Sequence, residues 1–391
     1  MVDISKRLKS LPAYLFAEID KKVDELKESG AKVIDFGVGD PKEPTVGLIR
    51  NYTKRSIDKR KDSGYPSYIG DKDFRDEVVS YFKKRFSVDL NPETEVCSTL
   101  GSKEAVFNFP EAFINPGDYV LIPNPGYPPW EKGTLFAEGK CFFMNLTEEN
   151  NFFPELDKVP EDIRKKAKIL WLNYPNNPTT QVATKEFYEK AVAFAKENDL
   201  LICSDEAYVD NYFGEDKPIS LLEVAKENVI VFHSLSKRSA MTCYRVGFVA
   251  GDKKIVDAFK KLKTNIDTGT ATFIQDAAVA ALSDENHVEE FNKIYQSKMK
   301  IISDALKSIG LPDSTPQGTI YLWQKLKDGM DSVEFATKLL DKKIALVVTP
   351  GEALSNEVDG VNPGKNYVRF ALVPTINECK EAAKRISDLK I

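Results

Sequence analysis

The sequence predicts an α/β fold: a large domain, in which helices cover both faces of a mostly parallel sheet, and a smaller α+β domain. Two patterns lead to this prediction. Short apolar runs alternate with stretches in which apolar residues recur at helical spacing, and the charge pattern changes after residue 283. Alternating strands and helices favour a parallel sheet, because each helix returns the chain to the edge where the next strand begins.

The first expected element is an amphipathic helix over residues 14–29. Apolar residues such as Leu15, Ile19 and Val23 recur there at near-helical spacing among Lys and Glu, and Gly30 ends the pattern. A short strand over residues 32–37 is expected next. Because the chain enters the large sheet only after a loop over 41–45, we expect residues 1–46 to form an N-terminal arm and part of the small domain.

The large domain is expected over residues 47–283. Its apolar runs are four or five residues long, which suits strands that are buried on both faces. A stretch with helical spacing over 185–198 separates two of them. The expected strands cover residues 119–122, 169–172, 200–203, 229–232 and 246–250.

The small C-terminal domain is expected over residues 284–391. Long helices rich in Lys and Glu come first, and strands are expected over 318–323, 345–348 and 367–371. The whole chain shows no repeat, low-complexity tract or flexible linker.

The composition excludes several classes of function. With 55 Lys and Arg against 60 Asp and Glu, the net charge of −5 disfavours nucleic acid as a partner. Five cysteines without a CxxC pair and two histidines argue against a metal site, and we expect none. No signal peptide is visible, and no apolar run approaches the roughly 18 residues of a membrane span, so we expect a cytoplasmic protein without a membrane partner.

Polar clusters that follow the expected strands carry the chemistry. They are Gly101–Lys103, Asn176–Thr179, Ser204–Tyr208 and Ser234–Lys237. Ligands of open α/β sheets bind beyond the carboxyl ends of the strands, so these loops are expected to meet at one crevice. Together they suit pyridoxal phosphate: a lysine can form an imine, a carboxylate can keep the pyridine nitrogen protonated, and hydroxyls, an arginine and helix-start amides can hold a phosphate.

The chain resembles the pyridoxal-phosphate aminotransferases of classes I and II, the aspartate aminotransferase superfamily, over nearly its whole length. The motifs occur in order: Gly39-Asp40-Pro41, Tyr65 before Gly70, Gly101–Ala105, Pro125–Pro128, Asn176–Thr179, Ser204–Tyr208, Ser234–Lys237, Arg245–Gly247, and Arg369 within Tyr367–Phe370. The resemblance implies the aspartate-aminotransferase-like fold, pyridoxal-phosphate fold type I. It also implies a homodimer with its sites at the subunit interface.

The resemblance also assigns roles around the cofactor ring. Lys237 is the implied catalytic residue, which binds the cofactor and, once displaced, moves the proton between the substrate α-carbon and the cofactor. Asp205 is expected to pair with the pyridinium nitrogen. Tyr208 and Asn177 are expected to bond the ring oxygen, and Tyr127 is expected to stack on the ring.

Further residues are implied for the phosphate and the substrate. For the phosphate they are the amides of Ser102 and Lys103, the hydroxyls of Ser234 and Ser236, Arg245, and Tyr65 of the partner subunit. Arg369 is expected to grip the substrate α-carboxylate, helped by the backbone near Gly39 and by Asn177.

The segment around the lysine suggests a branch of the family. Thr180 replaces the usual glycine after Asn-Pro-Thr, and residues 233–252 most resemble the N-succinyldiaminopimelate aminotransferases of lysine biosynthesis. The expected reaction is a ping-pong transamination, with glutamate as amino donor and a 2-oxo acid of the succinylated diaminopimelate type as acceptor. Open alternatives are an aspartate, aromatic or LL-diaminopimelate aminotransferase, a carbon–sulfur β-lyase on the same fold, and a catalytically silent binding or regulatory protein.

Overall fold

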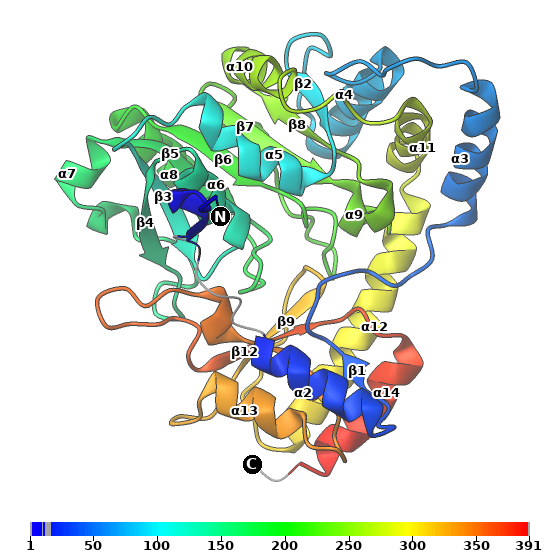
Figure 1. Cartoon of the computed structure of the whole chain (residues 1–391), viewed down its shortest axis with the longest axis vertical. Coiled ribbons are helices and arrows are strands. Elements are labelled where there is room, and N and C mark those ends of the chain that lie inside the picture. Colours follow the sequence, from blue (N-terminus) through cyan, green and yellow to red (C-terminus); the bar gives the residue numbers. More distant parts are fainter. Residues whose placement is uncertain (1, 10, 12–16, 390–391) are drawn as a thin grey trace.

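The structure is a computed structural model that describes residues 2–9, 11 and 17–389. A larger body, at the top of Figure 1, and a smaller one below it are joined by the long helix α12 (Asn286–Ser308). They are also joined by the segment between β1 (Ile34–Asp35) and α3 (Gly47–Lys59). The start of the expected first helix, residues 14–16, lies outside the described residues, and α2 (Ala17–Glu28) forms the rest of it.

The described residues of the large body form a seven-stranded sheet in the order β2-β8-β7-β6-β5-β3-β4. The pairs from β7 to β4 are parallel, whereas β8 runs antiparallel to both β7 and β2. The expected mostly parallel sheet is therefore confirmed. Its strands are β2 (Val96–Thr99), β3 (Tyr119–Asn124), β4 (Lys140–Asn145), β5 (Ala167–Asn173), β6 (Leu201–Asp205), β7 (Val229–Ser234) and β8 (Gly247–Gly251).

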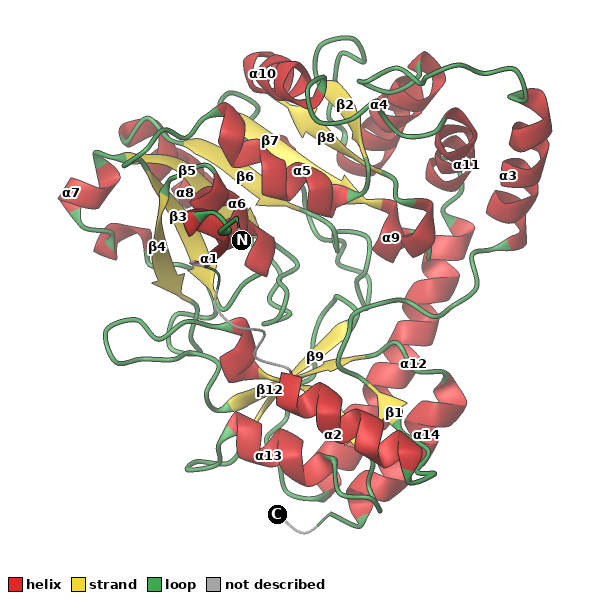
Figure 2. Cartoon of the chain, in the orientation of Figure 1, coloured by secondary structure: helices red, strands yellow, loops and turns green. Residues whose placement is uncertain are grey.

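Alternate side chains of each central strand enter two separate cores. In β5, Ile169 and Trp171 belong to one core, and Leu170 and Leu172 belong to the other. Helices α5 (Ser102–Asn108), α6 (Pro128–Phe136) and α10 (Lys253–Lys263) cover the first face, and α4 (Lys72–Phe86), α8 (Lys185–Glu197) and α11 (Thr272–Leu282) cover the second (Figure 2). Burial on both faces explains why these strands are continuous apolar runs.

The described residues of the small body form two small sheets. Antiparallel strands β11 (Thr349–Pro350), β12 (Tyr367–Ala371) and β9 (Tyr321–Lys325) form one, and parallel strands β1 and β10 (Leu346–Val347) form the other. Helices α12, α13 (Ser332–Leu339) and α14 (Ile376–Ser387) pack on them. Ile34 of β1 pairs with Leu346 of β10, so the N-terminal segment contributes to this core.

Several element boundaries differ from the expected ones. The strand expected over 318–323 begins at Tyr321, because the backbone of Thr319 is left-handed, with φ of 71°. The strand expected over 32–37 is reduced to β1, and strands β2 and β4 were not predicted. The remaining short helices are α1 (Lys6–Lys9), α7 (Glu161–Arg164) and α9 (Leu235–Arg238). Within the described residues, no helix is both long and apolar enough to cross a membrane.

Candidate active site

One edge of the large sheet gathers the functional side chains. Asn173 and Asp205 are paired residues at the carboxyl ends of β5 and β6, and Ser234 ends the neighbouring strand β7. Gly247 starts β8 opposite Ser234, and Thr99 ends β2 opposite Gly247. The antiparallel direction of β8 thus brings the loop after β2 to the same edge as the loops after β5, β6 and β7.

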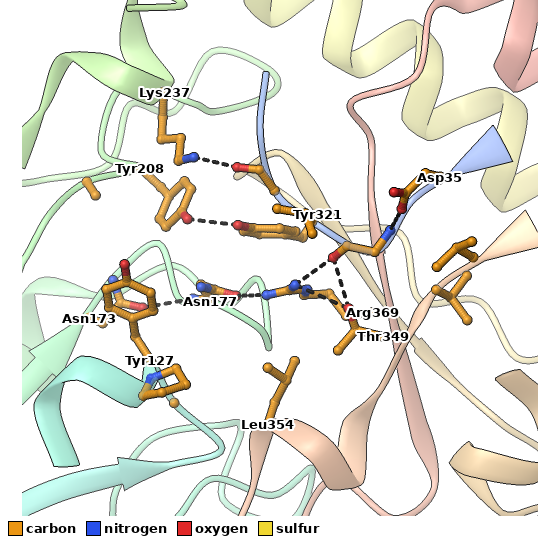
Figure 3. A pocket seen from close by; sticks show the side chains of 18 of the residues that line it. Asp35, Tyr127, Asn173, Asn177, Tyr208, Lys237, Tyr321, Thr349, Leu354 and Arg369 are labelled. Carbon is orange, nitrogen blue, oxygen red and sulfur yellow. Dashed lines mark hydrogen bonds between the residues drawn. The ribbon is translucent and has the colours of Figure 1, made fainter. Parts of the chain in front are cut away.

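A cavity of about 650 Å³ lies between this edge and the small body. Figure 3 shows side chains from both bodies meeting there. The predicted site residues in its lining are Gly39, Ser102, Tyr127, Asn177, Asp205, Tyr208, Ser234, Lys237 and Arg369. The predicted residues outside this lining are Tyr65, Lys103, Ser236 and Arg245.

Lys237 reaches the cavity from the short helix α9, which follows β7 directly. The hydroxyl of Ser234 accepts a hydrogen bond from the Ser236 N–H at 3.2 Å and caps this helix. The Lys237 amine donates a hydrogen bond to the carbonyl of Gly39, which lies in the segment between β1 and α3. Burial lowers the pKa of the Lys237 amine, which favours the neutral form that can attack a carbonyl or accept a proton.

The carboxylate of Asp205 is buried and has no cation as a partner in the part of the chain that the structure describes. It accepts a hydrogen bond from the Ala207 N–H at 3.2 Å, and burial raises the pKa of its carboxyl to about 7. The groups that modulate this pKa among the described residues include Glu206 but no cation. An unpaired buried charge is costly, and a protonated ring nitrogen in the cavity would supply the missing partner.

Asn173 orients the loop that carries Asn177. Its side-chain amide donates to the Asp205 carbonyl at 2.7 Å, and its Oδ1 accepts from the Asn177 N–H at 2.8 Å. Further along this loop, Thr180 has φ of 64°, a conformation that favours glycine. Its N–H still donates to the carbonyl of Asn176 at 2.9 Å, so the turn forms with threonine at the position where the resemblance led us to expect glycine.

Arg369 extends from β12 toward the large body. Its guanidinium donates to Asn177 Oδ1 at 2.9 Å and to the Gly37 carbonyl at 2.8 Å. Its Nε is buried and has no hydrogen-bond partner among the described residues, which marks a position for an acceptor such as a carboxylate. Arg369 thus contacts the segment around Gly39 at the carbonyl of Gly37, whereas the carbonyl of Gly39 accepts from Lys237.

Tyr321 is a site residue that sequence analysis missed. Its hydroxyl lies 2.9 Å from the Tyr208 hydroxyl, and the Arg369 guanidinium lies 4.6 Å from its ring centre (Figure 3). The residue fell within an expected strand, but an apolar strand pattern does not reveal which side chain faces a cavity.

Arg245 lies next to the cavity lining, on the outer side of the loop before α5. It donates to the carbonyls of Thr242 at 2.9 Å and Leu100 at 3.4 Å. A Cβ at Gly101 would lie 2.6 Å from the guanidinium, so this glycine lets the arginine approach the start of α5 beside Ser102.

The other predicted residues outside the lining differ in exposure. Ser236 is buried, and the Lys103 side chain is exposed. Tyr65 is 89% exposed and borders a second cavity of about 410 Å³, together with Arg60 and Arg75.

The fold and this set of donors define a pyridoxal-phosphate aminotransferase centre. Residues 31–386 match the family described as Aminotransferase class I and II, and the chain belongs to that family. It is 45% identical over 394 residues to LL-diaminopimelate aminotransferase of Aquifex aeolicus (strain VF5), with 100% of both chains covered. It is 43% identical over 394 residues to LL-diaminopimelate aminotransferase 2 of Trichormus variabilis (strain ATCC 29413 / PCC 7937), with 100% of this chain and 99% of the relative covered.

A solved structure of substrate-bound BacF from Bacillus subtilis is also similar, with a TM-score of 0.92 at 34% identity over 100% of this chain and 99% of that chain. The comparisons confirm the aspartate-aminotransferase-like fold and the dependence of the family on pyridoxal phosphate. They do not confirm the N-succinyldiaminopimelate branch, because the relatives named above are LL-diaminopimelate aminotransferases.

The cavity fits this cofactor. Lys237 offers an amine with a lowered pKa, Asp205 a carboxylate that lacks a cation, and Tyr208 a phenol. The hydroxyls of Ser102 and Ser234 lie in the same lining. When bound, pyridoxal phosphate supplies an electron sink that stabilises negative charge at the α-carbon of an amino acid.

Proposed function

We propose that this chain transfers an amino group between LL-diaminopimelate and a 2-oxo acid in lysine biosynthesis, with glutamate and 2-oxoglutarate as the second substrate pair. The observation that carries the proposal is the 45% identity to an LL-diaminopimelate aminotransferase over the full length of both chains. The N-succinylated substrate expected from sequence analysis has weaker support, since relatives at 41% to 45% identity carry the LL-diaminopimelate name.

We propose a role in this reaction for each of the main side chains that line the cavity. We expect the Lys237 amine to hold the cofactor in the resting enzyme. It is then expected to take the proton from the α-carbon of the amino donor, and to deliver a proton to the α-carbon of the new amino acid in the second half-reaction. The Asp205 carboxylate is expected to keep the pyridine nitrogen protonated, and Tyr208 and Asn177 to donate to the ring oxygen. Arg369, with its free Nε, is expected to bind the α-carboxylate.

Charged residues in the cavity lining favour a substrate that carries charges at the end distant from its reacting amino group. Besides the predicted site residues, the lining contains the apolar residues Val23, Val38, Val347 and Leu354 and the charged residues Asp24, Lys27 and Asp35. The Asp24 carboxylate and the Lys27 amine lie 3.7 Å apart on α2. Diaminopimelate has methylene groups between its two amino-acid ends, and its distal ammonium and carboxylate match these two charges. Succinylation would replace that ammonium by a neutral amide, which no longer needs a carboxylate.

The test is a panel of amino donors offered to the purified protein with pyridoxal phosphate and 2-oxoglutarate. The panel contains LL-diaminopimelate, N-succinyl-LL-diaminopimelate, aspartate and phenylalanine, and the product measured is glutamate. We expect the highest kcat/KM with LL-diaminopimelate. A higher value with the N-succinyl compound would support the N-succinyldiaminopimelate hypothesis instead. In a separate assay with cystathionine, release of pyruvate without glutamate formation would identify a β-lyase.

A further inference from the structure

Tyr321 lies between the part of the site that is expected to bind the cofactor and the part that is expected to bind the substrate carboxylate. It lies on β9 of the small body and is 3% exposed. Its hydroxyl faces Tyr208, the phenol expected to bond the cofactor, and its ring lies against Arg369, the group expected to bind the substrate. Figure 3 shows the tyrosine between these two side chains at the wall of the cavity.

Close packing against the backbone fixes the position of this phenol. A Cβ at Gly39 would lie 2.0 Å from the Tyr321 hydroxyl oxygen and 2.7 Å from the ring carbon that bears it. Gly39 therefore leaves the space that the phenol fills, and the carbonyl of the same glycine accepts from Lys237. The N-terminal side of Tyr321 is also held, because its N–H donates to Thr319 Oγ1 at 3.1 Å. A side chain held in this way can orient its neighbours.

We propose that Tyr321 is a positioning residue with two separable roles: its hydroxyl orients the Tyr208 phenol for the cofactor, and its ring holds the Arg369 guanidinium for the substrate carboxylate. The proposal rests on the proposed transaminase function, because both roles require a cofactor and a carboxylate substrate in this cavity.

The role of the hydroxyl follows from the hydrogen-bonding capacity of a phenol. Tyr208 has one hydrogen to donate. If it donates that hydrogen to the cofactor ring oxygen, its own oxygen can only accept, and the Tyr321 hydroxyl at 2.9 Å is placed to donate to it. Hydrogen bonds in such a chain polarise one another, so Tyr321 strengthens the donation by Tyr208. A stronger donor to a negatively charged ring oxygen lowers the pKa of the lysine-bound cofactor.

The role of the ring follows from its place beside the guanidinium. Two nitrogens of Arg369 donate hydrogen bonds to Asn177 and Gly37, and the ring centre of Tyr321 lies 4.6 Å from the guanidinium carbon. An aromatic face attracts a cation without using its N–H groups, so Nε remains free for a ligand. This role needs the ring and not the hydroxyl.

The Tyr321→Phe variant of the holoenzyme tests the hydroxyl. Loss of one hydrogen bond to Tyr208 is expected to raise the midpoint of the pH-dependent absorption change of the bound cofactor by about 0.5 to 1 pH unit. The dissociation constant of glutarate, an unreactive carboxylate measured through the same absorption, is expected to stay within about twofold, because the ring is retained. An unchanged midpoint would overturn the role of the hydroxyl.

The Tyr321→Leu variant tests the ring. It is expected to raise the same midpoint and also to weaken glutarate binding by about tenfold. Equal glutarate affinity in the Leu and Phe variants would overturn the role of the ring. If the Leu variant does not fold, Tyr321→Met keeps more of the side-chain bulk without an aromatic face and gives the same comparison.

Tyr367→Phe is the matched control. Tyr367 lies on the neighbouring strand β12, and its ring stacks on Trp323 at 5.1 Å, outside the cavity lining. This variant is expected to change neither the midpoint nor the glutarate affinity. A wild-type protein without a cofactor absorption band would contradict the proposed function itself. A different result is a wild type with a normal cofactor band and normal turnover, together with a Tyr321→Phe variant whose absorption midpoint equals that of the wild type. This result would contradict the role of Tyr321 and leave the proposed function intact.

Discussion

The buried carboxyl group of Asp205 is expected to make the stability of the cofactor-free protein depend on pH. Its burial without a cation raises its pKa to about 7, from an ordinary value of 3.8. Between these two pH values the folded, cofactor-free protein keeps a proton that the unfolded chain releases. The stability of the cofactor-free protein should therefore fall as the pH rises through this window, and should change little above it.

The Asp205→Asn variant should remove this pH dependence. Without its cofactor, the variant is expected to melt several degrees above the wild type at pH 8, and this difference should vanish as the pH approaches 4. The same change should weaken cofactor binding, because the ring nitrogen loses its charged partner. Thermal melts of the cofactor-free proteins from pH 4 to 8 measure the effect, with the exposed Asp58→Asn as control. Parallel profiles for Asp205→Asn and the wild type would show that Asp205 is not an unpaired buried carboxyl.

We expect the Asp24 carboxylate to contact the distal ammonium group of diaminopimelate. Asp24 is 72% exposed at the cavity wall, so its charge is partly screened by water. Asp24→Asn is therefore expected to lower kcat/KM for LL-diaminopimelate by about fivefold, and to leave the half-reaction with glutamate unchanged. Glu25→Gln, on the same helix but outside the cavity lining, is the control. A loss of equal size with both amino acids would mean that Asp24 does not contact the distal charges.

At the level of elements, α9 depends on its neighbours for its position. Its four residues are too few for a helix to be stable by its own hydrogen bonds. Arg238 anchors it by donating to Asp210 at 2.9 Å, to the Ala281 carbonyl at 2.7 Å, and to Glu285 at the start of α12. Arg238 thus points into the large body, and it holds in place the helix that presents Lys237.

Removing this anchor should destabilise the protein. Arg238→Ala is expected to lower the free energy of unfolding by about 3–5 kcal/mol, because it leaves buried Asp210 with one cation fewer. Denaturant unfolding measures the loss, and Lys254→Ala, an exposed residue of α10, should cost less than about 0.5 kcal/mol. A similar small loss for both variants would show that Arg238 does not anchor α9.

The same elements show what the sequence could and could not predict. Helix α8 was expected over 185–198 and is found over Lys185–Glu197, because Thr184 caps it by accepting from the Phe187 N–H at 3.2 Å. Strand β12 was predicted at its observed bounds, since its residues are buried in the small core. The start of β9 was wrong because a left-handed threonine is not visible in an apolar pattern.

The site was predictable where polar residues follow strands. The clusters that contain Lys237, Asp205 and Asn177 were found in this way, the family resemblance supplied the roles of these residues, and the structure brings them to one cavity. Tyr321 and the Gly37 carbonyl were not found, because they come from the small body and their contacts depend on how the two bodies meet. Their residue types alone do not mark them as site residues. They belong to the site because of where the folded chain places them.

At the scale of the whole molecule, we propose a homodimer with shared sites. Tyr65 is 89% exposed, although it belongs to a motif expected at the cofactor phosphate. An exposed phenol on one subunit can complete the site of another only if the two chains pair across this surface. The surface around Tyr65 and the cavity that it borders with Arg60 and Arg75 then belong to the interface.

Mixing two inactive variants tests this arrangement. Lys237→Ala lacks the amine, and Tyr65→Ala lacks the phenol that we expect to act in the partner. After unfolding and refolding together, mixed dimers should contain one complete site, and about a quarter of the wild-type activity should return. The variants refolded separately are the controls. No recovery in a mixture that sediments as a dimer would contradict a shared site.

We propose that the cofactor reacts in the cavity between the two bodies, bound through the Lys237 amine. Borohydride reduction of the protein loaded with pyridoxal phosphate, followed by mass spectrometry of its peptides, tests this assignment. We expect a cofactor adduct on the peptide that contains Lys237, and its loss in Lys237→Ala. An adduct on another lysine, such as the exposed Lys103, or no adduct on a folded protein, would contradict it.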